Sequence, residues 1–242
     1  MANMMKEGSA QPAESHLDLV IFDCDGVLID SELLATQADV ACLAEEGIIL
    51  SIDEVLDRYT GVSVAGMIAD IRVRYGRQIA DVGEFERRHE LLVKALFDTS
   101  LKPIPGVRTV LDALACKFCV ASSSSLERIR HALARTGLID RFDPHIYDAS
   151  MVENGKPAPD LFLYAAKRMG VTTDRCIVVE DSEAGITAAQ AAGMMSIGFT
   201  GGSHCRPGHA ARLREKGAVQ IVDSMPALLA TLTAAIAGSR LS

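Results

Sequence analysis

Tryptophan is absent from this 242-residue sequence, and aromatic residues make up only 5% of it. Basic residues are also outnumbered, with 24 Lys and Arg against 32 Asp and Glu, which gives a net charge of −8. A nucleic-acid-binding surface needs clustered positive charge and often uses stacking aromatic side chains, so we expect no nucleic acid partner. The acidic balance favours solubility. It leaves an anionic substrate possible, because a metal ion and one Lys can reverse the field at a local site.

Long hydrophobic runs are absent too, although 49% of the residues are hydrophobic. The most apolar stretch, 227–237, is too short to cross a bilayer and is interrupted by Thr, so we expect no membrane contact. Residues 1–16 are polar and contain no apolar segment. This composition predicts a disordered tail and no secretory signal.

Cysteine is neither abundant nor paired, since six residues are scattered through an otherwise ordinary globular sequence. This usage indicates reduced thiols and a cytoplasmic protein. Cys116 and Cys119 form a C-x-x-C pair, but no second Cys or His pair with zinc-finger spacing follows it. We therefore expect neither a zinc centre nor redox chemistry at this pair.

The stretch 16–32 reads HLDLVIFDCDGVLIDSE, in which two carboxylates follow an apolar run. Residues 17–22 are too few for a helix and rich in branched side chains, so they predict a buried strand. Asp23 and Asp25 come directly after this strand, and Gly26 allows a backbone turn that a bulkier residue would resist. In open α/β sheets ligands gather at the carboxyl ends of the strands, which is where these carboxylates are expected.

Two neighbouring carboxylates repel each other, so burying them requires a cation, a shared proton or several hydrogen-bond donors. Oxygen ligands suit a hard divalent cation such as Mg²⁺. A solvated acidic turn is the alternative interpretation. A calcium loop is excluded, because Gly26 follows Asp25 directly and the third acidic ligand position is missing.

The hydrophobic pattern divides the rest of the chain into a helical segment and an α/β segment. Apolar residues fall at helical spacing through residues 31–98, with a capping box from Ser51 to Glu54. Strand and helix patterns alternate over 99–242, which predicts parallel strands joined by right-handed crossovers. We therefore predict an α/β fold: a doubly wound, parallel, Rossmann-like core from 17–30 and 99–242, with 31–98 inserted as an α-helical cap domain. The later strands are expected at 118–121, 145–147, 176–179, 195–199 and 218–222, and the later helices at 126–134, 159–169, 183–192 and 226–237.

Serine-rich sequence follows the second expected strand of the core. Ser122 and Ser123 open a helix start, where backbone N–H groups attract anions and hydroxyls add donors. Ser124 is assigned to helix capping instead, because Ser124 and Glu127 match a capping box. A purely capping role is the alternative for the other serines of this run.

A lysine and a second acidic pair complete the set of polar groups. Lys156 lies in the stretch GKPAPD, where the following proline restricts its backbone to extended values. A solvated surface lysine is the ordinary interpretation, but a Lys aimed at a phosphoryl oxygen or an aspartate is a common electrostatic device. Glu180 and Asp181 follow the strand at 176–179, where they could cap the next helix or hold a metal ion.

Four motifs thus follow one another along the chain, namely Asp23-Cys-Asp25, Ser122, Lys156 and Glu180-Asp181. In this order they resemble the signature of the haloacid dehalogenase superfamily of phosphohydrolases. The resemblance extends from about residue 17 to residue 222, and the predicted helical insertion resembles the mobile cap of that family. The stretches DGVLIDSE and GKPAPD are similar to those of the subfamily that contains β-phosphoglucomutase and small sugar-phosphate phosphatases.

The resemblance implies an Mg²⁺-dependent phosphatase in which Asp23 is the nucleophile and forms an aspartyl-phosphate. Asp25 would protonate the leaving oxygen and then take a proton from the attacking water. Ser122, Ser123 and Lys156 would hold the phosphoryl oxygens. The implied Mg²⁺ ligands are Asp23, Asp25 through its backbone carbonyl, Asp181 and, as a ligand or as the partner of one, Glu180.

Two other activities of the same family are alternatives. Dehalogenases generally lack the second Asp of the first motif and need no metal, so Asp25 and Asp181 argue against that activity. A β-phosphoglucomutase-type enzyme is closer. By resemblance it would carry a His early in the cap and an Arg after the cap's Gly-Val-Ser turn, where this chain has Ala35 and Val64. Because Val cannot grip a second phosphate, the sequence favours hydrolysis of a singly phosphorylated substrate.

Two further alternatives come from other functional classes, a phospho-receiver domain and a non-catalytic phosphometabolite-binding protein. Receiver domains are usually compact and have no helical insertion such as the one between Asp23 and Ser122. A catalytically inactive binding protein is disfavoured, because all four motifs are present.

Substrate specificity is expected to lie in the cap. The turn of Gly61, Val62 and Ser63 resembles the substrate-facing loop of the subfamily. The other polar candidates in the cap, most of which are expected to be solvated, are Arg58, Tyr59, Arg72, Arg74, Arg87, Arg88, His89 and Lys94. Sugar, sugar-alcohol and sugar-acid phosphates, such as 6-phosphogluconate, all stay open. We expect a small phosphorylated metabolite as the partner, and a monomer or a weak homo-oligomer.

Overall fold

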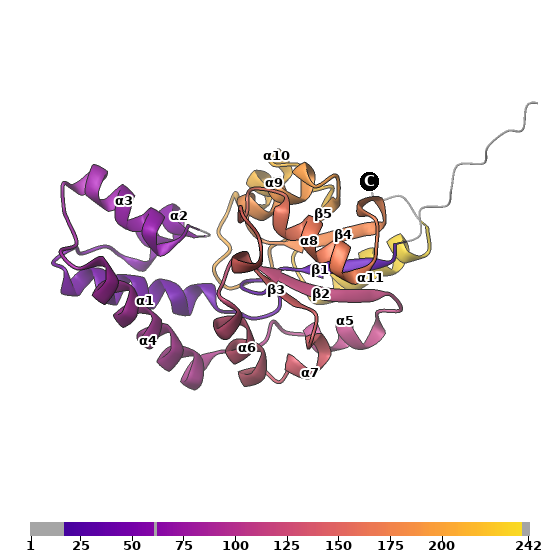
Figure 1. Cartoon of the computed structure of the whole chain (residues 1–242), viewed down its shortest axis with the longest axis horizontal. Coiled ribbons are helices and arrows are strands. Elements are labelled where there is room, and N and C mark those ends of the chain that lie inside the picture. Colours follow the sequence, from indigo (N-terminus) through magenta and orange to yellow (C-terminus); the bar gives the residue numbers. More distant parts are fainter. Residues whose placement is uncertain (1–16, 61, 239–242) are drawn as a thin grey trace, which may run out of the picture.

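A six-stranded, fully parallel sheet forms the centre of the computed structural model, with the strand order β3-β2-β1-β4-β5-β6 (Figure 1). The structure describes residues 17–60 and 62–238, so the predicted tail at 1–16 and the predicted loop residue Gly61 lie outside the described residues. The sheet and its flanking helices confirm the predicted fold class. The strands are β1 Leu19–Phe22, β2 Lys117–Ser122, β3 Ile146–Asp148, β4 Cys176–Glu180, β5 Met195–Phe199 and β6 Gln220–Val222.

β1 lies between β2 and β4 in the middle of the sheet, and all four of its residues are buried. A strand covered on both faces needs apolar side chains at every position, which explains the unbroken apolar run. The chain adds β2 and β3 on one side of β1, and then crosses to the other side for β4, β5 and β6. The strand order therefore reverses next to β1, and such a switch point is where a crevice forms at the carboxyl ends of parallel strands.

Helices cover both faces of the sheet. Val20 and Phe22 point into one apolar cluster, whereas Leu19 and Ile21 point into another on the opposite face. The first cluster is covered by α5 Val107–Ala113, α6 Leu126–Arg135, α7 Ile139–Phe142 and α11 Met225–Ile236, and the second by α8 Asp160–Met169 and α9 Glu183–Ala191. α10 His209–Glu215 packs beside α9, β5 and β6. Two short 3-10 helices, Ala149–Met151 and Thr173–Arg175, complete the core.

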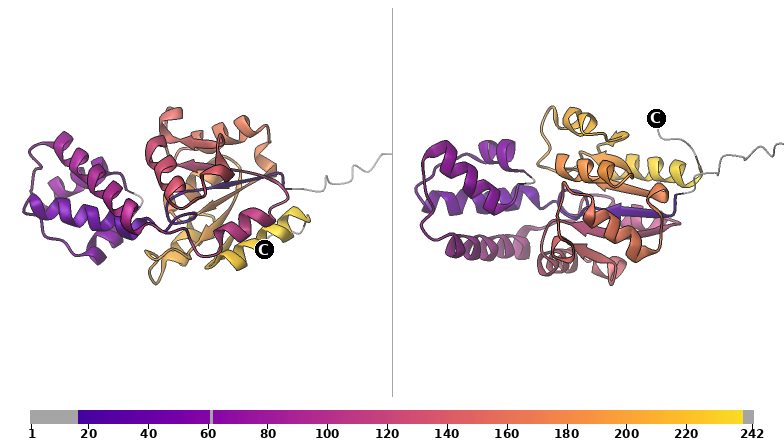
Figure 2. Two further views of the ribbon diagram at one scale, coloured as in Figure 1. Left: turned by 90° about the horizontal axis from the view of Figure 1, so that it is seen from below. Right: turned by 45° about the horizontal axis from the view of Figure 1, so that its top comes forward.

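Four helices stand to one side of the sheet (Figures 1 and 2). They are α1 Glu32–Glu45, α2 Ile52–Tyr59, α3 Val64–Tyr75 and α4 Val82–Ser100. They share an apolar cluster of their own, which includes Leu43, Met67, Ile71 and Phe85. Through Phe97, α4 also packs into the cluster that contains Val20 and Phe22, which we call the sheet-side cluster. The helices occupy the stretch for which a cap domain is predicted, and we refer to them as the α1–α4 unit. The capping box of Ser51 and Glu54 is present at the start of α2.

The prediction that Ser124 caps the helix after β2 was wrong. The N-cap of α6 is Ser125, whose hydroxyl accepts a hydrogen bond from the backbone N–H of Arg128 at 3.3 Å. β2 continues to Ser122, and Ser124 follows in a turn in which its N–H donates to the Ser122 hydroxyl at 3.1 Å. The helix begins at residue 126, as predicted, but its cap is Ser125, and the Ser124 hydroxyl is left for another partner.

Two short helices, α7 and α10, were not predicted, and the last strand begins at Gln220 rather than at residue 218. All six cysteines are free thiols. Cys116 packs against the apolar cluster on one face of the sheet, and Cys119 lies in the cluster on the other. The C-x-x-C pair therefore does not converge on a shared site. Within the residues that the structure describes, no helix is both long and apolar enough to cross a bilayer.

Candidate active site

The carboxyl ends of three neighbouring strands bring the predicted polar groups to one edge of the sheet. Asp23 follows β1 and is fixed there by its backbone N–H, which donates to the carbonyl of Val179 in β4 at 2.9 Å. A cavity of about 370 Å³ opens between this edge and the α1–α4 unit. The predicted site residues that line it are Asp23, Asp25, Ser122, Ser123, Lys156, Glu180, Asp181, Val62 and Ser63.

Lys156 links the first and last motifs. Its ammonium group donates to Asp23 Oδ1 at 2.6 Å, to Glu180 Oε1 at 2.6 Å and to the carbonyl of Ala121 at 2.9 Å. The Lys156 side chain is only 3% exposed. Burial disfavours the charged ammonium, but the carboxylates of Asp23 and Glu180 outweigh that effect and raise its pKa. Lys156 is therefore a fixed positive charge inside a cluster of carboxylates.

One lysine does not neutralise this cluster. Burial raises the pKa of Asp23 well above its ordinary value, Lys156 opposes that rise, and repulsion from Glu180 and Asp181 adds to it. Carboxyl oxygens of Asp23, Glu180 and Asp181 lie within 4.8 Å of one another, and all three residues are buried. Buried carboxylates in such excess require either a bound proton or further positive charge.

The hydrogen bonds indicate which oxygens of this cluster are open to a cation. Both oxygens of Glu180 are engaged, Oε1 by Lys156 and Oε2 by the N–H and hydroxyl of Ser182 at 2.9 and 2.8 Å. A Cβ added at Gly185 would lie 1.8 Å from Glu180 Oε1, so the glycine makes room for this arrangement. In contrast, Asp23 Oδ2 and Asp181 Oδ1 have no hydrogen-bond partner among the described residues. A hard divalent cation fits this oxygen donor set.

The Asp25 carboxylate accepts hydrogen bonds from two serines, whereas Asp23 is held by Lys156. The hydroxyl of Ser31 donates to Asp25 Oδ1 at 2.6 Å, and the hydroxyl of Ser124 donates to Oδ2 at 2.7 Å. The Arg128 guanidinium lies 3.8 Å from Oδ1 and stacks over the Phe97 ring. Ser124 therefore contributes a hydroxyl to the site, although only Ser122 and Ser123 were expected to do so.

Asp181 adjoins the turn after β1 and the loop after β5. A Cβ at Gly26, whose φ is +73°, would lie 1.9 Å from Asp181 Oδ2, so only glycine fits the turn beside this carboxylate. His204 Nε2 lies 3.0 Å from the same oxygen, and His209 Nε2 lies 2.5 Å from the Asp181 carbonyl oxygen. Burial disfavours charge on His204, but the neighbouring Asp181 and Cys205 raise its pKa to about 11. In the metal-free chain the charged imidazole partly balances Asp181.

Several lining residues were not singled out from the sequence. Glu32 begins α1, and burial together with repulsion from Asp25 and Asp181 raises its pKa to about 7. Its place in the DSE of the first motif was the one sequence signal that could have identified it. Arg128 lines the cavity from α6, and no sequence pattern distinguishes it from the arginines that follow it on the same helix.

The cap candidates divide into a few cavity residues and many surface residues. Tyr59 and His89 line the cavity, as do Thr60, Val62 and Ser63. His89 is buried, with Nε2 2.9 Å from Asp39 Oδ1. Ser63 also caps α3, because its hydroxyl accepts from the N–H of Gly66. The surface ion pairs of the unit include Arg58 with Glu54, Arg74 with Asp70, Arg87 with Glu84, Arg88 with Glu45 and Glu46, and Lys94 with Asp98.

Comparisons with known sequences match the chain to one family description. The family model for haloacid dehalogenase-like hydrolases matches residues 17–193. A 6-phosphogluconate phosphatase of Escherichia coli (strain K12) is 33% identical over 193 residues, which cover 80% of this chain and 87% of that protein. A beta-phosphoglucomutase of Mycobacterium bovis is 32% identical, with 86% of this chain and 90% of that protein covered.

A comparison with solved structures gives the same result. The crystal structure of a conserved haloacid dehalogenase-like protein of unknown function from Agrobacterium tumefaciens superposes with a TM-score of 0.81. It is 38% identical in sequence, and the match covers 90% of this chain and 99% of that one. The similarity therefore includes both the sheet and the α1–α4 unit.

Proposed function

The chain belongs to the haloacid dehalogenase-like hydrolase family, and from this premise we propose that it is an Mg²⁺-dependent phosphatase that hydrolyses small sugar phosphates through an aspartyl-phosphate. The observation that carries the proposal is the setting of Asp23. One of its oxygens is held by Lys156 at 2.6 Å, and the other has no hydrogen-bond partner among the described residues and belongs to a cavity-lining side chain. An oriented carboxylate with one oxygen available is suited to nucleophilic attack on phosphorus.

Charge is the main obstacle to that attack, because a phosphate dianion approaches a cluster of carboxylates. Lys156 supplies one fixed positive charge beside Asp23. Mg²⁺, held by Asp23, Asp181 and the carbonyl of Asp25, would supply the further positive charge that the buried carboxylates require. Glu180 is not an Mg²⁺ ligand in this proposal, because its two carboxylate oxygens accept hydrogen bonds from Lys156 and Ser182.

Asp25 is proposed to move the proton. Attack by Asp23 breaks the bond between phosphorus and the leaving oxygen, and Asp25 donates a proton to that oxygen. Asp25 then takes a proton from the water that hydrolyses the aspartyl-phosphate. The hydroxyls of Ser31 and Ser124 fix the Asp25 carboxyl for both transfers. Ser122 and Ser123 line the same cavity and would donate to the phosphoryl oxygens.

Hydrolysis is favoured over a phosphomutase reaction by the composition of the cavity wall. A mutase must bind a second phosphate while the first is transferred. Ala35 and Val64, which stand where the mutase resemblance implies a His and an Arg, both line the cavity. Neither side chain can bind a phosphate, although a relative named beta-phosphoglucomutase is 32% identical to this chain.

The cavity also supports a substrate with a second anionic group smaller than a phosphate. Arg128 lines the cavity from α6, and its guanidinium lies 3.8 Å from Asp25 Oδ1. A guanidinium at a cavity wall can bind a substrate carboxylate through charge-assisted hydrogen bonds. We therefore place sugar-acid phosphates first, consistent with the similarity to a protein named 6-phosphogluconate phosphatase.

The test is phosphate release from a panel of phosphorylated metabolites in the presence of Mg²⁺. The panel includes 6-phosphogluconate, neutral sugar phosphates and β-glucose 1-phosphate with a bisphosphate primer, which detects a mutase. We expect phosphate release by the wild type, none by Asp23→Asn, and wild-type rates for Asp98→Asn, an exposed carboxylate paired with Lys94. Turnover by Asp23→Asn would refute the nucleophile, and sugar-phosphate isomerisation without phosphate release would refute hydrolysis.

A further inference from the structure

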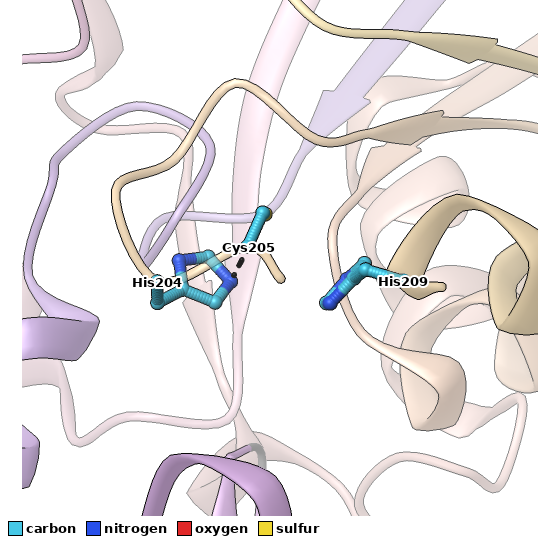
Figure 3. Close-up of side chains that lie close together, drawn as sticks. All are labelled: His204, Cys205 and His209. Atoms are coloured by element: carbon cyan, nitrogen blue, oxygen red, sulfur yellow. Dashed lines mark hydrogen bonds between the residues drawn. The ribbon is translucent and has the colours of Figure 1, made fainter. Parts of the chain in front are cut away.

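Two histidines and a cysteine lie close together in the structure (Figure 3). His204 and Cys205 are adjacent in the loop after β5, and His209 is the first residue of α10. Their imidazole nitrogens and thiol sulfur lie within 4.8 Å of one another. The proposed phosphatase chemistry assigns no step to any of these three groups, so their convergence calls for a separate explanation.

Backbone hydrogen bonds fold this loop into its shape. The N–H of Cys205 donates to the carbonyl of Gly202, and the N–H of His209 donates to the carbonyl of Arg206, both at 3.1 Å. The loop is also attached to the segment between β1 and α1, because the N–H and hydroxyl of Ser203 donate to Asp30 at 3.0 and 2.8 Å. The backbone of the loop is therefore fixed in the conformation that brings the three side chains together, and a preorganised ligand site requires such support.

The burial of the three groups suits an ion-binding site with one accessible side. The His204 side chain is 1% exposed and His209 is buried, whereas Cys205 is half-buried. Buried imidazoles need polar partners, and a half-buried thiol leaves a route for an ion from solvent. The rings of His204 and His209 meet edge to face rather than stacking in parallel.

The distance between Cys205 and His204 matches a tetrahedral zinc centre. With Zn–S near 2.3 Å and Zn–N near 2.0–2.1 Å, two ligands of a tetrahedral site lie about 3.5 Å apart. Cys205 Sγ is 3.5 Å from His204 Nε2. Asp181 Oδ2 lies 3.0 Å from the same nitrogen and offers a fourth donor. Two imidazoles, a thiolate and a carboxylate are ligand types that Zn²⁺ takes and that Mg²⁺ does not prefer.

We propose that His204, Cys205 and His209 form a second metal site that binds Zn²⁺, with Asp181 Oδ2 as the fourth ligand. Binding releases the protons of the thiol and of His204 Nε2 to solvent, because only the thiolate and the neutral imidazole are ligands. Because Asp181 is also a proposed Mg²⁺ ligand, it would be shared between the Zn²⁺ site and the proposed Mg²⁺ site.

Cobalt spectroscopy tests the site without any activity measurement. Co²⁺ is titrated into the full chain in excess Mg²⁺, and we expect one equivalent to give a thiolate-to-cobalt charge-transfer band that Zn²⁺ abolishes. Cys205→Ser should lose the band and His209→Gln should weaken Co²⁺ binding. Cys116→Ser, which alters another half-buried thiol outside the cluster, should keep the band. A wild-type titration without the band, or a band that persists in Cys205→Ser, would overturn the proposal.

The shared carboxylate gives a second readout, Mg²⁺ affinity measured by calorimetry. Two cations on one carboxylate repel, so Zn²⁺ and Mg²⁺ should weaken each other's binding by about tenfold or more. Zn²⁺-loaded wild type should therefore bind Mg²⁺ more weakly than the Zn²⁺-free chain, and this difference should vanish in Cys205→Ser. An equal effect of Zn²⁺ in both proteins would show that Zn²⁺ occupies the Mg²⁺ site itself, which contradicts the bridged arrangement. Neither measurement depends on the proposed phosphatase activity.

Discussion

Lys156 holds Asp23 and Glu180 together although the residues are distant in sequence, and its ammonium group is buried between them. We predict that Lys156→Met destabilises the chain by about 3–5 kcal/mol in the absence of metal, because it leaves buried carboxylates without their counterion. Urea unfolding in EDTA measures the change. Lys94→Met is the matched control, since Lys94 is exposed and pairs with Asp98 on the surface, and its unfolding midpoint should stay near that of the wild type. Equal midpoints for the two variants would contradict the structural role of Lys156.

Glu32 gives a pH dependence whose sign can be derived. Burial, with repulsion from Asp25 and Asp181, raises its pKa from the ordinary value of 4.5 to about 7. The folded chain therefore binds more protons than the unfolded chain between these two values, so this group's contribution to stability falls as the pH rises through that window. We predict that Glu32→Gln removes about 1–3 kcal/mol of the stability lost by the metal-free wild type between pH 4.5 and pH 7.

Unfolding free energies of both proteins across this pH range in EDTA measure that difference. Glu86→Gln is the control, because Glu86 is exposed on α4 and should leave the wild-type slope unchanged. If Glu32→Gln and the wild type lose stability in parallel as the pH rises, then Glu32 does not carry a raised pKa in the folded chain.

Arg128 allows the proposed substrate class to be tested apart from the reaction type. We predict that Arg128→Met lowers kcat/KM for 6-phosphogluconate about tenfold or more relative to a neutral sugar phosphate, because one charge-assisted hydrogen bond is lost. The ratio of the two kcat/KM values is the readout, since contact with Asp25 affects both substrates. Arg130→Met is the control, because Arg130 lies on the same helix and pairs with Asp143. A common factor for both substrates would rule out recognition of the carboxylate by Arg128.

At the start of α6, adjacent serines have separate functions. Ser125 caps the helix, whereas the Ser124 hydroxyl donates to Asp25 at 2.7 Å. We predict that Ser125→Ala lowers the free energy of unfolding by about 0.5–2 kcal/mol with little effect on kcat. Ser124→Ala should lower kcat with little effect on stability, because Asp25 loses an orienting donor. Unfolding and turnover measured on both variants would contradict this division if each variant lost both properties together.

These serines also show what the sequence could and could not predict. The apolar run of β1 and the alternation of strands and helices come from local patterns, and they were sufficient for the sheet and for β5. Whether Ser124 or Ser125 caps α6 depends on where β2 ends, and pairing within the sheet sets that end. The same holds for α10, whose seven residues bury only His209 and Leu213 and give no helical apolar stripe.

The candidate site was predictable where residue types follow strand ends in a known order. Asp23, Ser122, Lys156 and Asp181 could be placed together because parallel strands direct their carboxyl ends to one edge. Arg128 and Glu32 could not, since their helices present many charged residues and only tertiary packing selects the ones that line the cavity. Likewise, the contacts of His204 and His209 with Asp181 depend on a loop whose conformation no local sequence pattern predicts.

The apolar clusters of the sheet and the apolar cluster of the α1–α4 unit meet only partly. The α1–α4 unit has its own cluster, and α4 joins the sheet-side cluster through Val93 and Phe97. The cavity lies between the two parts, so its walls approach each other if the unit moves. Among the described residues, no residue of α2 or α3 belongs to the sheet-side cluster, and the cluster that these helices join is smaller than it. Such segments open locally at lower free energy than a central strand.

We therefore predict that backbone amides of α2 and α3 exchange hydrogen faster than those of β1 and β4, and that Mg²⁺ with beryllofluoride, a phosphoryl mimic, slows exchange in residues 52–75. Closure over the occupied cavity would bring Thr60, Val62 and Ser63 against the bound group and exclude water from the aspartyl adduct. Hydrogen exchange read by mass spectrometry measures both effects. Asp23→Asn is the control, because it cannot form the adduct and should show no slowing. Adduct formation by the wild type with unchanged exchange in 52–75 would show that the α1–α4 unit does not act as a closing cap.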